Sequence, residues 1–241
     1  MAEKNMVKKK KRVMLKLSGE VFSGDGESVF ELSRMENIIR EIKEIHAGGC
    51  QLAITIGGGN IWRYRDCIDL PIERSDSDFL GMLATLMNAV VFKGMLLKEH
   101  ISAVAFSRID APQIIPRYFR ETARNHLMSG DVVILAGGTG NPYFTTDSAA
   151  ALSALELGCE ELLKATKVDY VYDKDPMKHR NAKSFDSLSF SDILAKRLMV
   201  MDLTAVSLCQ EAHLPIRIFN VLKKGNLLKA CNGDHVGTLV S

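Results

Sequence analysis

Apolar runs alternate along the chain with stretches in which apolar residues recur every three to four positions. A short run of β-branched and other apolar residues predicts a strand buried on both faces, because such a strand has no solvent face to carry polar residues. Residues 21–30 show no period and are expected to form a mobile loop, and residues 173–176 a turn. The ranges expected to be extended are 13–20, 52–56, 101–107, 132–135, 162–166, 170–172, 216–219 and 237–240.

The first helix pattern begins at Ser33. This residue and Glu36 have the spacing of a capping box, in which the two side chains bond free backbone N–H groups of the first turn. Gly48 and Gly49 mark the end of the helix. The apolar stripe between these signals consists of Met35, Ile38, Ile39, Ile42 and Ile45.

A longer apolar segment begins at Asp78 and predicts a helix of about five turns. It is apolar on too many faces for a helix that only covers its own sheet, so we expect it to contact a second subunit as well. Further helices are expected at 118–128 and 147–158, with two more before the strand at 216–219 and a short one after it.

Strands and helices thus alternate throughout, which is typical of a mostly parallel sheet covered by helices on both faces. The predicted fold is α/β, a three-layer αβα sandwich. No Pro/Gly-rich linker divides the chain, so residues 13–241 are expected to form one domain. The preceding residues 1–12 end in the basic run Lys8–Arg12, which we interpret as a solvated leader.

Composition narrows the function classes. Apolar residues make up 46% and charged residues 25%, and the net charge of +2 gives no general reason to expect a nucleic-acid or membrane partner. Five cysteines, at 50, 67, 159, 209 and 231, form no CxxC pair, which favours reduced thiols in a cytoplasmic protein over a disulfide framework or zinc site. No targeting segment or membrane span is recognised. No HExxH or similar ligand spacing occurs either, so no protein-held metal is expected.

The candidate chemistry lies where predicted strands end in glycine turns. The run Gly57-Gly58-Gly59 is followed by Arg63, and the strand 132–135 empties into a loop with Gly137, Gly138 and Gly140. Backbone N–H groups of such turns can approach an anion closely, and the carboxyl ends of parallel strands are where open α/β sheets bind ligands. Asp147 stands at the next helix entrance, where it could be a simple cap, but the specialised loop before it favours a substrate cradle.

Lys16 lies in an otherwise apolar strand that ends in Ser18-Gly19, so its ammonium group could face a phosphate at the same edge. No GxxxxGK[ST] motif, GxSxG elbow or Cys/His pair occurs. Phosphoryl transfer needs positioning and charge neutralisation more than a base, and it fits a chain with no candidate catalytic histidine.

A series of short motifs carries a resemblance. In chain order they read LKLSGE, IGGGNIWR, GMLATLMNA, GTGNPYFTTDSAA, LLKATKVD, YDKDP, VMDLTA and LPIRIFN. Together they resemble the bacterial UMP kinases of the amino acid kinase family over about residues 12–241. The resemblance implies transfer of the ATP γ-phosphoryl group to UMP, giving UDP and ADP in pyrimidine nucleotide biosynthesis, with Mg²⁺ as the counter-ion of ATP.

The resemblance also implies roles for individual residues. Lys16 would stabilise the transferring group, and Asp147 would orient the catalytic lysines. The residues matched to ATP contacts are Lys16, Leu17, Ser18, Gly19, Gly59, Arg63, Thr166, Tyr172 and Asp175. Those matched to UMP contacts are Gly58, Asp78, Thr139, Gly140, Asn141, Pro142, Tyr143, Phe144, Thr145 and Thr146.

Two positions depart from the family pattern, Tyr64 after the arginine and Tyr170 in place of the glycine of KVDGV. A tyrosine at a site of positive φ would be strained, so the ATP site is where differences are expected. The resemblance further implies a homohexamer built as a trimer of dimers, with GTP and UTP as effectors. Two alternatives are a kinase of a carboxylate substrate, which GTGNPYFTTD argues against, and a nucleotide sensor without catalysis, which would need neither Lys16 nor Asp147.

Overall fold

A central sheet organises the protein. The computed structural model describes all residues except 1–10, 25–27, 67–68, 180, 197 and 199–200. In that part of the chain the sheet has eight strands in the order β3-β4-β2-β1-β5-β9-β10-β8, all paired in parallel except β9 with β10. The strands are β1 (Arg12–Leu17), β2 (Gln51–Ile56), β3 (Ala103–Ser107), β4 (Val132–Ala136), β5 (Glu161–Thr166), β8 (Ser187–Leu188), β9 (Ile216–Asn220) and β10 (Thr238–Val240).

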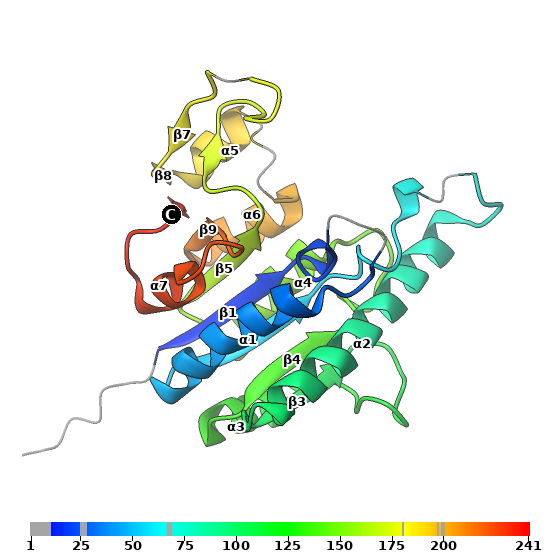
Figure 1. Cartoon of the computed structure of the whole chain (residues 1–241). Coiled ribbons are helices and arrows are strands. Elements are labelled where there is room, and N and C mark those ends of the chain that lie inside the picture. Colours follow the sequence, from blue (N-terminus) through cyan, green and yellow to red (C-terminus); the bar gives the residue numbers. More distant parts are fainter. Residues whose placement is uncertain (1–10, 25–27, 67–68, 180, 197, 199–200) are drawn as a thin grey trace, which may run out of the picture.

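Helices cover both faces of this sheet, as Figure 1 shows. One apolar core packs α1 (Leu32–Ala47), α2 (Arg74–Lys98) and α7 (Asn226–Asn232) against one face. The other packs α3 (Arg120–Ser129), α4 (Thr146–Leu157), α5 (Phe190–Lys196) and α6 (Leu203–Glu211) against the opposite face. The predicted three-layer αβα fold with a mostly parallel sheet is confirmed. Beside it, β6 (Val171–Tyr172) and β7 (Ser184–Phe185) form a small antiparallel pair.

The register of the central strands decides which side chains meet. Strand β1 lies between β2 and β5, and Lys16 pairs with Thr55 on one side and with Lys164 on the other. Because these strands are parallel, their carboxyl ends share one edge of the sheet. The turns after β1 and β2 and the polar end of β5 therefore come together there.

The structure corrects the expected helix starts. Helix α1 begins at Leu32, and its N-cap Glu31 makes no side-chain cap bond. The Ser33 hydroxyl instead donates to the Glu31 carboxylate at 2.9 Å, so the capping box is wrong, although all five residues of the apolar stripe are buried. Helix α2 begins at Arg74, a full turn before Asp78, because the polar residues of that turn continue the helix.

The basic leader at 1–12 and the loop at 21–30 also differ from expectation. Strand β1 begins at Arg12, whose side chain bonds Gln51 at 2.7 Å, while Lys8–Lys10 lie outside the described residues. The expected loop at 21–30 is anchored at its start, since Val21 and Phe22 are fully buried. Residues 25–27 of that loop are not described.

Helix α2 combines core contacts with an exposed apolar face. By length and composition alone it could cross a membrane, a test that the core helices of soluble proteins also pass, so the chain does contain one stretch of this kind although none was expected. Its buried side packs against β3 and β4. Side chains left 38–54% exposed on it are Phe79, Leu80, Leu83, Met87, Val90 and Leu97.

Candidate active site

A carboxylate held between two lysines forms the centre of the site. Asp147, in the first turn of α4, contacts Lys16 of β1 at 2.9 Å through Oδ1 and Lys164 of β5 at 2.5 Å through Oδ2. The three side chains are only 11–12% exposed. Lys16 and Lys164 are register partners on adjacent strands, so the sheet itself aims both ammonium groups at the same carboxylate.

Burial and charge act in opposite directions on this cluster. Burial alone would raise the pKa of Asp147, but the two ammonium groups outweigh it and hold that pKa below its ordinary value of 3.8. Burial lowers the pKa of Lys164 below its ordinary value, against the Asp147 carboxylate and with help from the Lys16 charge. Two lysines thus share a single carboxylate, so the cluster offers an incoming phosphate chain more basic than acidic side chains.

Asp202 adds a second carboxylate beside the first. It caps α6 by accepting from the Ala205 N–H at 2.8 Å, and it also accepts from the Thr145 hydroxyl and from the N–H and hydroxyl of Ser148, at 3.2 and 2.8 Å. It therefore ties α6 to the start of α4. A cavity of about 210 Å³ joins it with Lys16, Asp147 and the glycine turns.

Two glycine turns form the floor of that cavity. A Cβ on Gly19 would lie 2.4 Å from Asn60 Oδ1 and 2.7 Å from the Gly59 nitrogen. A Cβ on Gly58 would lie 2.6 Å from the Gly81 carbonyl oxygen of α2. These approaches exclude side chains at both positions, so the turn after β1 rests directly on the turn after β2, and the latter on α2.

Buried polar residues of α2 hold the turns. Asn88, fully buried, donates to the Gly57 carbonyl at 2.7 Å and exchanges amide hydrogen bonds with Asn60 at 2.8 and 3.0 Å. The Thr85 hydroxyl accepts from the Gly137 N–H at 2.7 Å. Helix α2 thus fixes the turns after both β2 and β4.

The loop from β4 to α4 closes a larger cavity of about 530 Å³ against α2. Asp78 lines it and accepts from the Tyr143 N–H at 2.8 Å and from Arg74 Nε at 2.9 Å. Tyr143 has a φ of 70°, an unusual conformation for a residue with a Cβ. We call this space, on the α2 side of the lysine cluster, the acceptor cavity, after the residues matched to UMP that line it.

The residues matched to UMP divide between this cavity and the outer loop. Those that line the acceptor cavity are Gly58, Asp78, Phe144, Thr145 and Thr146. Those that lie in the loop but line none of the cavities described are Thr139, Gly140, Asn141, Pro142 and Tyr143.

Gly59 and Arg63, matched to ATP, lie in the acceptor cavity together with the UMP set. Arg63 is held by the Glu20 carboxylate at 3.0 Å and by the Gly59 carbonyl oxygen. Gly59 also lines the small central cavity and thus stands at the boundary between the two spaces. Tyr64, one of the two residues that depart from the family pattern, also lines the acceptor cavity, and it does not line the third cavity described next.

A third cavity, of about 400 Å³, lies on the other side of the lysine cluster, over β5, β6 and β9. It brings together Thr166, Tyr172 and Asp175, three residues matched to ATP that are distant from the glycine turns in sequence. Tyr170 lines it too and does not have a positive φ, so its backbone carries no such strain. Leu17 is the exception among the ATP set, since its side chain is fully buried and its carbonyl accepts from the Gly57 N–H at 2.9 Å.

Comparison with known proteins agrees with this geometry. The amino acid kinase family matches residues 11–220, most of the chain. The chain belongs to the amino acid kinase family. The solved UMP kinase of Bacillus anthracis is 33% identical, with a TM-score of 0.93 over 96% of each chain. The UMP kinase of Ureaplasma parvum is 30% identical, with a TM-score of 0.91 over 96% of this chain and 99% of its own. The uridylate kinase of Archaeoglobus fulgidus, at 24% identity and a TM-score of 0.74 over 95% and 99%, shares the fold.

Sequence reasoning missed three parts of this kinase site. Lys164 lies in LLKAT as Lys16 lies in VMLKL, a lysine inside an apolar strand, and the same argument would have found it. Asp202 looks like an ordinary helix cap, and its second role depends on tertiary contacts. Thr85 and Asn88 are polar residues in an otherwise apolar helix, a signal that was available but unused.

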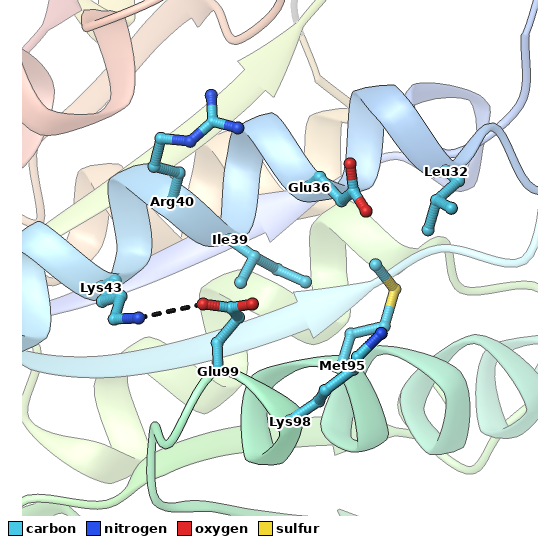
Figure 2. Close-up of a pocket in the computed structure, with 8 residues that line it drawn as sticks. All are labelled: Leu32, Glu36, Ile39, Arg40, Lys43, Met95, Lys98 and Glu99. Carbon is cyan, nitrogen blue, oxygen red and sulfur yellow. Dashed lines mark hydrogen bonds and ion pairs between the residues drawn. The ribbon is translucent and has the colours of Figure 1, made fainter.

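One further cavity of the kinase, about 390 Å³, lies between α1 and α2 (Figure 2). Ile39 and Met95 point into it, and the Lys43 ammonium contacts the Glu99 carboxylate across it at 2.9 Å. It is lined by α1, by the last turn of α2 and by Glu99, which follows α2. It contains none of the glycine turns or the lysine cluster, so it is separate from the active site.

The described residues contain no group of three or more His, Cys, Asp and Glu side chains placed to hold a metal ion. Both oxygens of Asp147 and of Asp202 already face lysines or hydrogen-bond donors. The four cysteines among the described residues have free thiols, and Cys67 lies outside that part of the kinase.

Proposed function

We propose that this kinase transfers the γ-phosphoryl group of ATP to UMP, giving UDP and ADP in pyrimidine nucleotide biosynthesis. One observation carries the proposal. The acceptor cavity is closed by the loop that contains GTGNPYFTT and opens beside the Lys16–Asp147–Lys164 cluster, while the third cavity lies on the other side of that cluster. A donor and an acceptor nucleotide would therefore meet at the two ammonium groups.

The residues at the centre would act by position and charge. Lys16 and Lys164 would face the oxygens of the transferring group, where negative charge is redistributed in the transition state. Asp147 would hold both ammonium groups in place without contacting the phosphate itself. A phosphate monoester with a second pKa near 6 is mostly dianionic at pH 7, so the acceptor oxygen needs no general base.

Mg²⁺ would enter as the counter-ion of ATP. Magnesium is usually bound through one or two carboxylates and the phosphates of the substrate, and it keeps several waters. Asp147 and Asp202 are already engaged by lysines and hydrogen-bond donors, so the phosphates of the nucleotide and water would supply most of the ligands of the ion. The ion supplies charge neutralisation on the phosphate chain.

The choice of UMP as acceptor rests on two supports. The loop residues matched to UMP line the acceptor cavity through Phe144, Thr145 and Thr146, and Asp78 reaches the same space. In addition, two solved proteins at least 30% identical over nearly their whole length bear the name UMP kinase. Each oxygen of Asp78 accepts one protein donor and keeps a lone pair for a substrate hydroxyl.

The test is an acceptor comparison with purified protein. ADP release from MgATP is measured with UMP, CMP, N-acetylglutamate and aspartate under one set of conditions. We expect turnover with UMP to exceed that with any other acceptor by at least about tenfold. Preferred turnover of a carboxylate acceptor would replace the proposal with an amino acid kinase activity, and UMP binding without turnover would replace it with nucleotide sensing.

Assembly and regulation are proposed on separate grounds. The exposed apolar face of α2 fits burial against a second copy, and we propose a homohexamer built as a trimer of dimers. GTP and UTP are the proposed effectors and the cytoplasm the proposed location, both from the family resemblance. Light scattering after size-exclusion chromatography tests the hexamer, and a monomeric mass would contradict it.

A further inference from the structure

A chain of three contacts links the segment after the glycine turn of β2 to the loop between β4 and α4, which we call the acceptor loop. The Arg74 guanidinium lies over the Tyr64 ring, 4.6 Å from its centroid. Arg74 Nε then donates to Asp78 Oδ1 at 2.9 Å, and Asp78 Oδ2 accepts from the Tyr143 N–H at 2.8 Å. Tyr64, Arg74 and Asp78 all line the acceptor cavity.

The far end of this chain is a residue that needs an external contact. Tyr143 has a φ of 70°, which is unfavourable for a residue with a Cβ and persists only where its surroundings hold it. Its side chain does not supply this hold, because Tyr143 is 71% exposed. The hydrogen bond from its N–H to Asp78 is therefore the contact that ties this part of the loop to α2.

The near end explains why the Asp78 carboxylate stays in place. The Arg74 side chain is 46% exposed, and an exposed ion pair one helical turn apart gains little because water screens it and both side chains lose freedom. The face of the Tyr64 ring covers one side of the guanidinium and limits its rotamers. Arg74 is thus fixed between an aromatic ring and a carboxylate.

We infer that Tyr64 is a positioning residue for the acceptor. Through Arg74 and Asp78 it holds the acceptor loop in the conformation that receives the acceptor nucleotide, and so it sets acceptor affinity rather than the rate of phosphoryl transfer. This inference rests on the proposed function for its kinetic consequence, but the contacts themselves exist in the free protein.

The kinetic test compares Tyr64→Leu, which removes the aromatic face, with Tyr64→Phe, which keeps it. An exposed cation–π contact corresponds to about a two- to fivefold change in an equilibrium constant. We expect Tyr64→Leu to raise KM for UMP by about that factor, with KM for MgATP and kcat unchanged, and Tyr64→Phe to match the wild type. An unchanged KM for UMP in Tyr64→Leu, an equal rise for MgATP, or an equal loss in Tyr64→Phe would overturn the inference.

A second measurement separates this inference from the choice of substrate. Hydrogen–deuterium exchange at the Tyr143 amide is followed in the ligand-free wild type and in both variants. Tyr64→Leu should accelerate this exchange by the same two- to fivefold factor, while Tyr64→Phe should not. Acceleration without UMP turnover by the wild type would retain the positioning role and reject UMP as the acceptor, whereas equal exchange in all three proteins would reject the role itself.

Discussion

Asp147→Asn is the most informative single change, because it keeps the shape of the side chain and removes the charge that both lysines face. The two contacts, at 2.9 and 2.5 Å, join groups that are only 11–12% exposed, so solvent screening is weak. Removing one partner of a buried ion pair costs about 3–5 kcal/mol, since it leaves an uncompensated charge. Against a total stability of about 5–15 kcal/mol, the variant would be folded but marginal.

The same change should separate binding from turnover. Two ammonium groups without their carboxylate still attract phosphate, so MgATP affinity should be retained. They are no longer held at fixed positions, and loss of one preorganised group at a developing charge typically lowers kcat by about 10²–10³. Urea unfolding gives the stability, calorimetry gives MgATP binding, and steady-state kinetics below the melting temperature give kcat. A stability loss under about 1 kcal/mol together with kcat within tenfold of the wild type would refute this account of the cluster.

The difference in stability between the wild type and Asp147→Asn should change with pH in a definite direction. The folded-state pKa of Asp147 is held below its ordinary value of 3.8, so the unfolded chain binds the proton first as pH falls. The stabilisation by the carboxylate is therefore fully present above that value and is lost as pH falls through the lower folded-state pKa. The stability gap between wild type and Asp147→Asn should narrow in that acidic window, and a gap that widens there would contradict the charge argument.

Three further changes test other parts of the site. Lys164→Met keeps the length of the side chain and leaves Asp147 paired with Lys16 at 2.9 Å, so it should lower kcat by about 10²–10³ and cost less stability than Asp147→Asn, as kinetics and calorimetry will show. Asp202→Ala removes the α6 cap and the ties to α4, and should cost about 2 kcal/mol, a fall in Tm of about 4–8 °C. Gly58→Ala places a Cβ 2.6 Å from the Gly81 carbonyl and should cost about 1–3 kcal/mol, whereas Gly94→Ala, with nothing within 4 Å of its Cβ, should stabilise α2 by about 0.5–1 kcal/mol. Equal thermal shifts for the two glycine variants would refute the close approach of the turn to α2.

The fold was predictable because its signals are local. Apolar runs located the principal strands, and the stripe of α1 was buried as its spacing requires. Helix boundaries were less accessible, since Ser33 and Glu36 have the right spacing for a capping box but the N-cap of α1 lies two residues earlier, at Glu31. A cap depends on the entry angle of the preceding segment, which spacing does not encode.

The site was predictable in part for the same reason. Lys16 and Asp147 each stand in a distinctive local pattern, and the structure joins them. Lys164 stands in the same pattern as Lys16 but was not singled out, and its role follows from strand register, whereas Asp202 has no such local pattern because its second role comes from the packing of α6 on α4. The contact between Tyr64 and Arg74 bridges ten positions across a turn and a helix start, so it too emerges only in three dimensions.

UDP formation from UMP and MgATP by the wild type and by Lys16→Ala, with UMP binding measured for both, tests the central claim most directly. We predict that the wild type forms UDP and that the variant binds UMP with similar affinity but forms UDP at least about 10²-fold more slowly, because the group at the transferring phosphate is gone. Equal rates of UDP formation by the two proteins would contradict the assignment of catalysis to the lysine cluster, and UMP binding by a wild type that forms no UDP would contradict the proposed reaction.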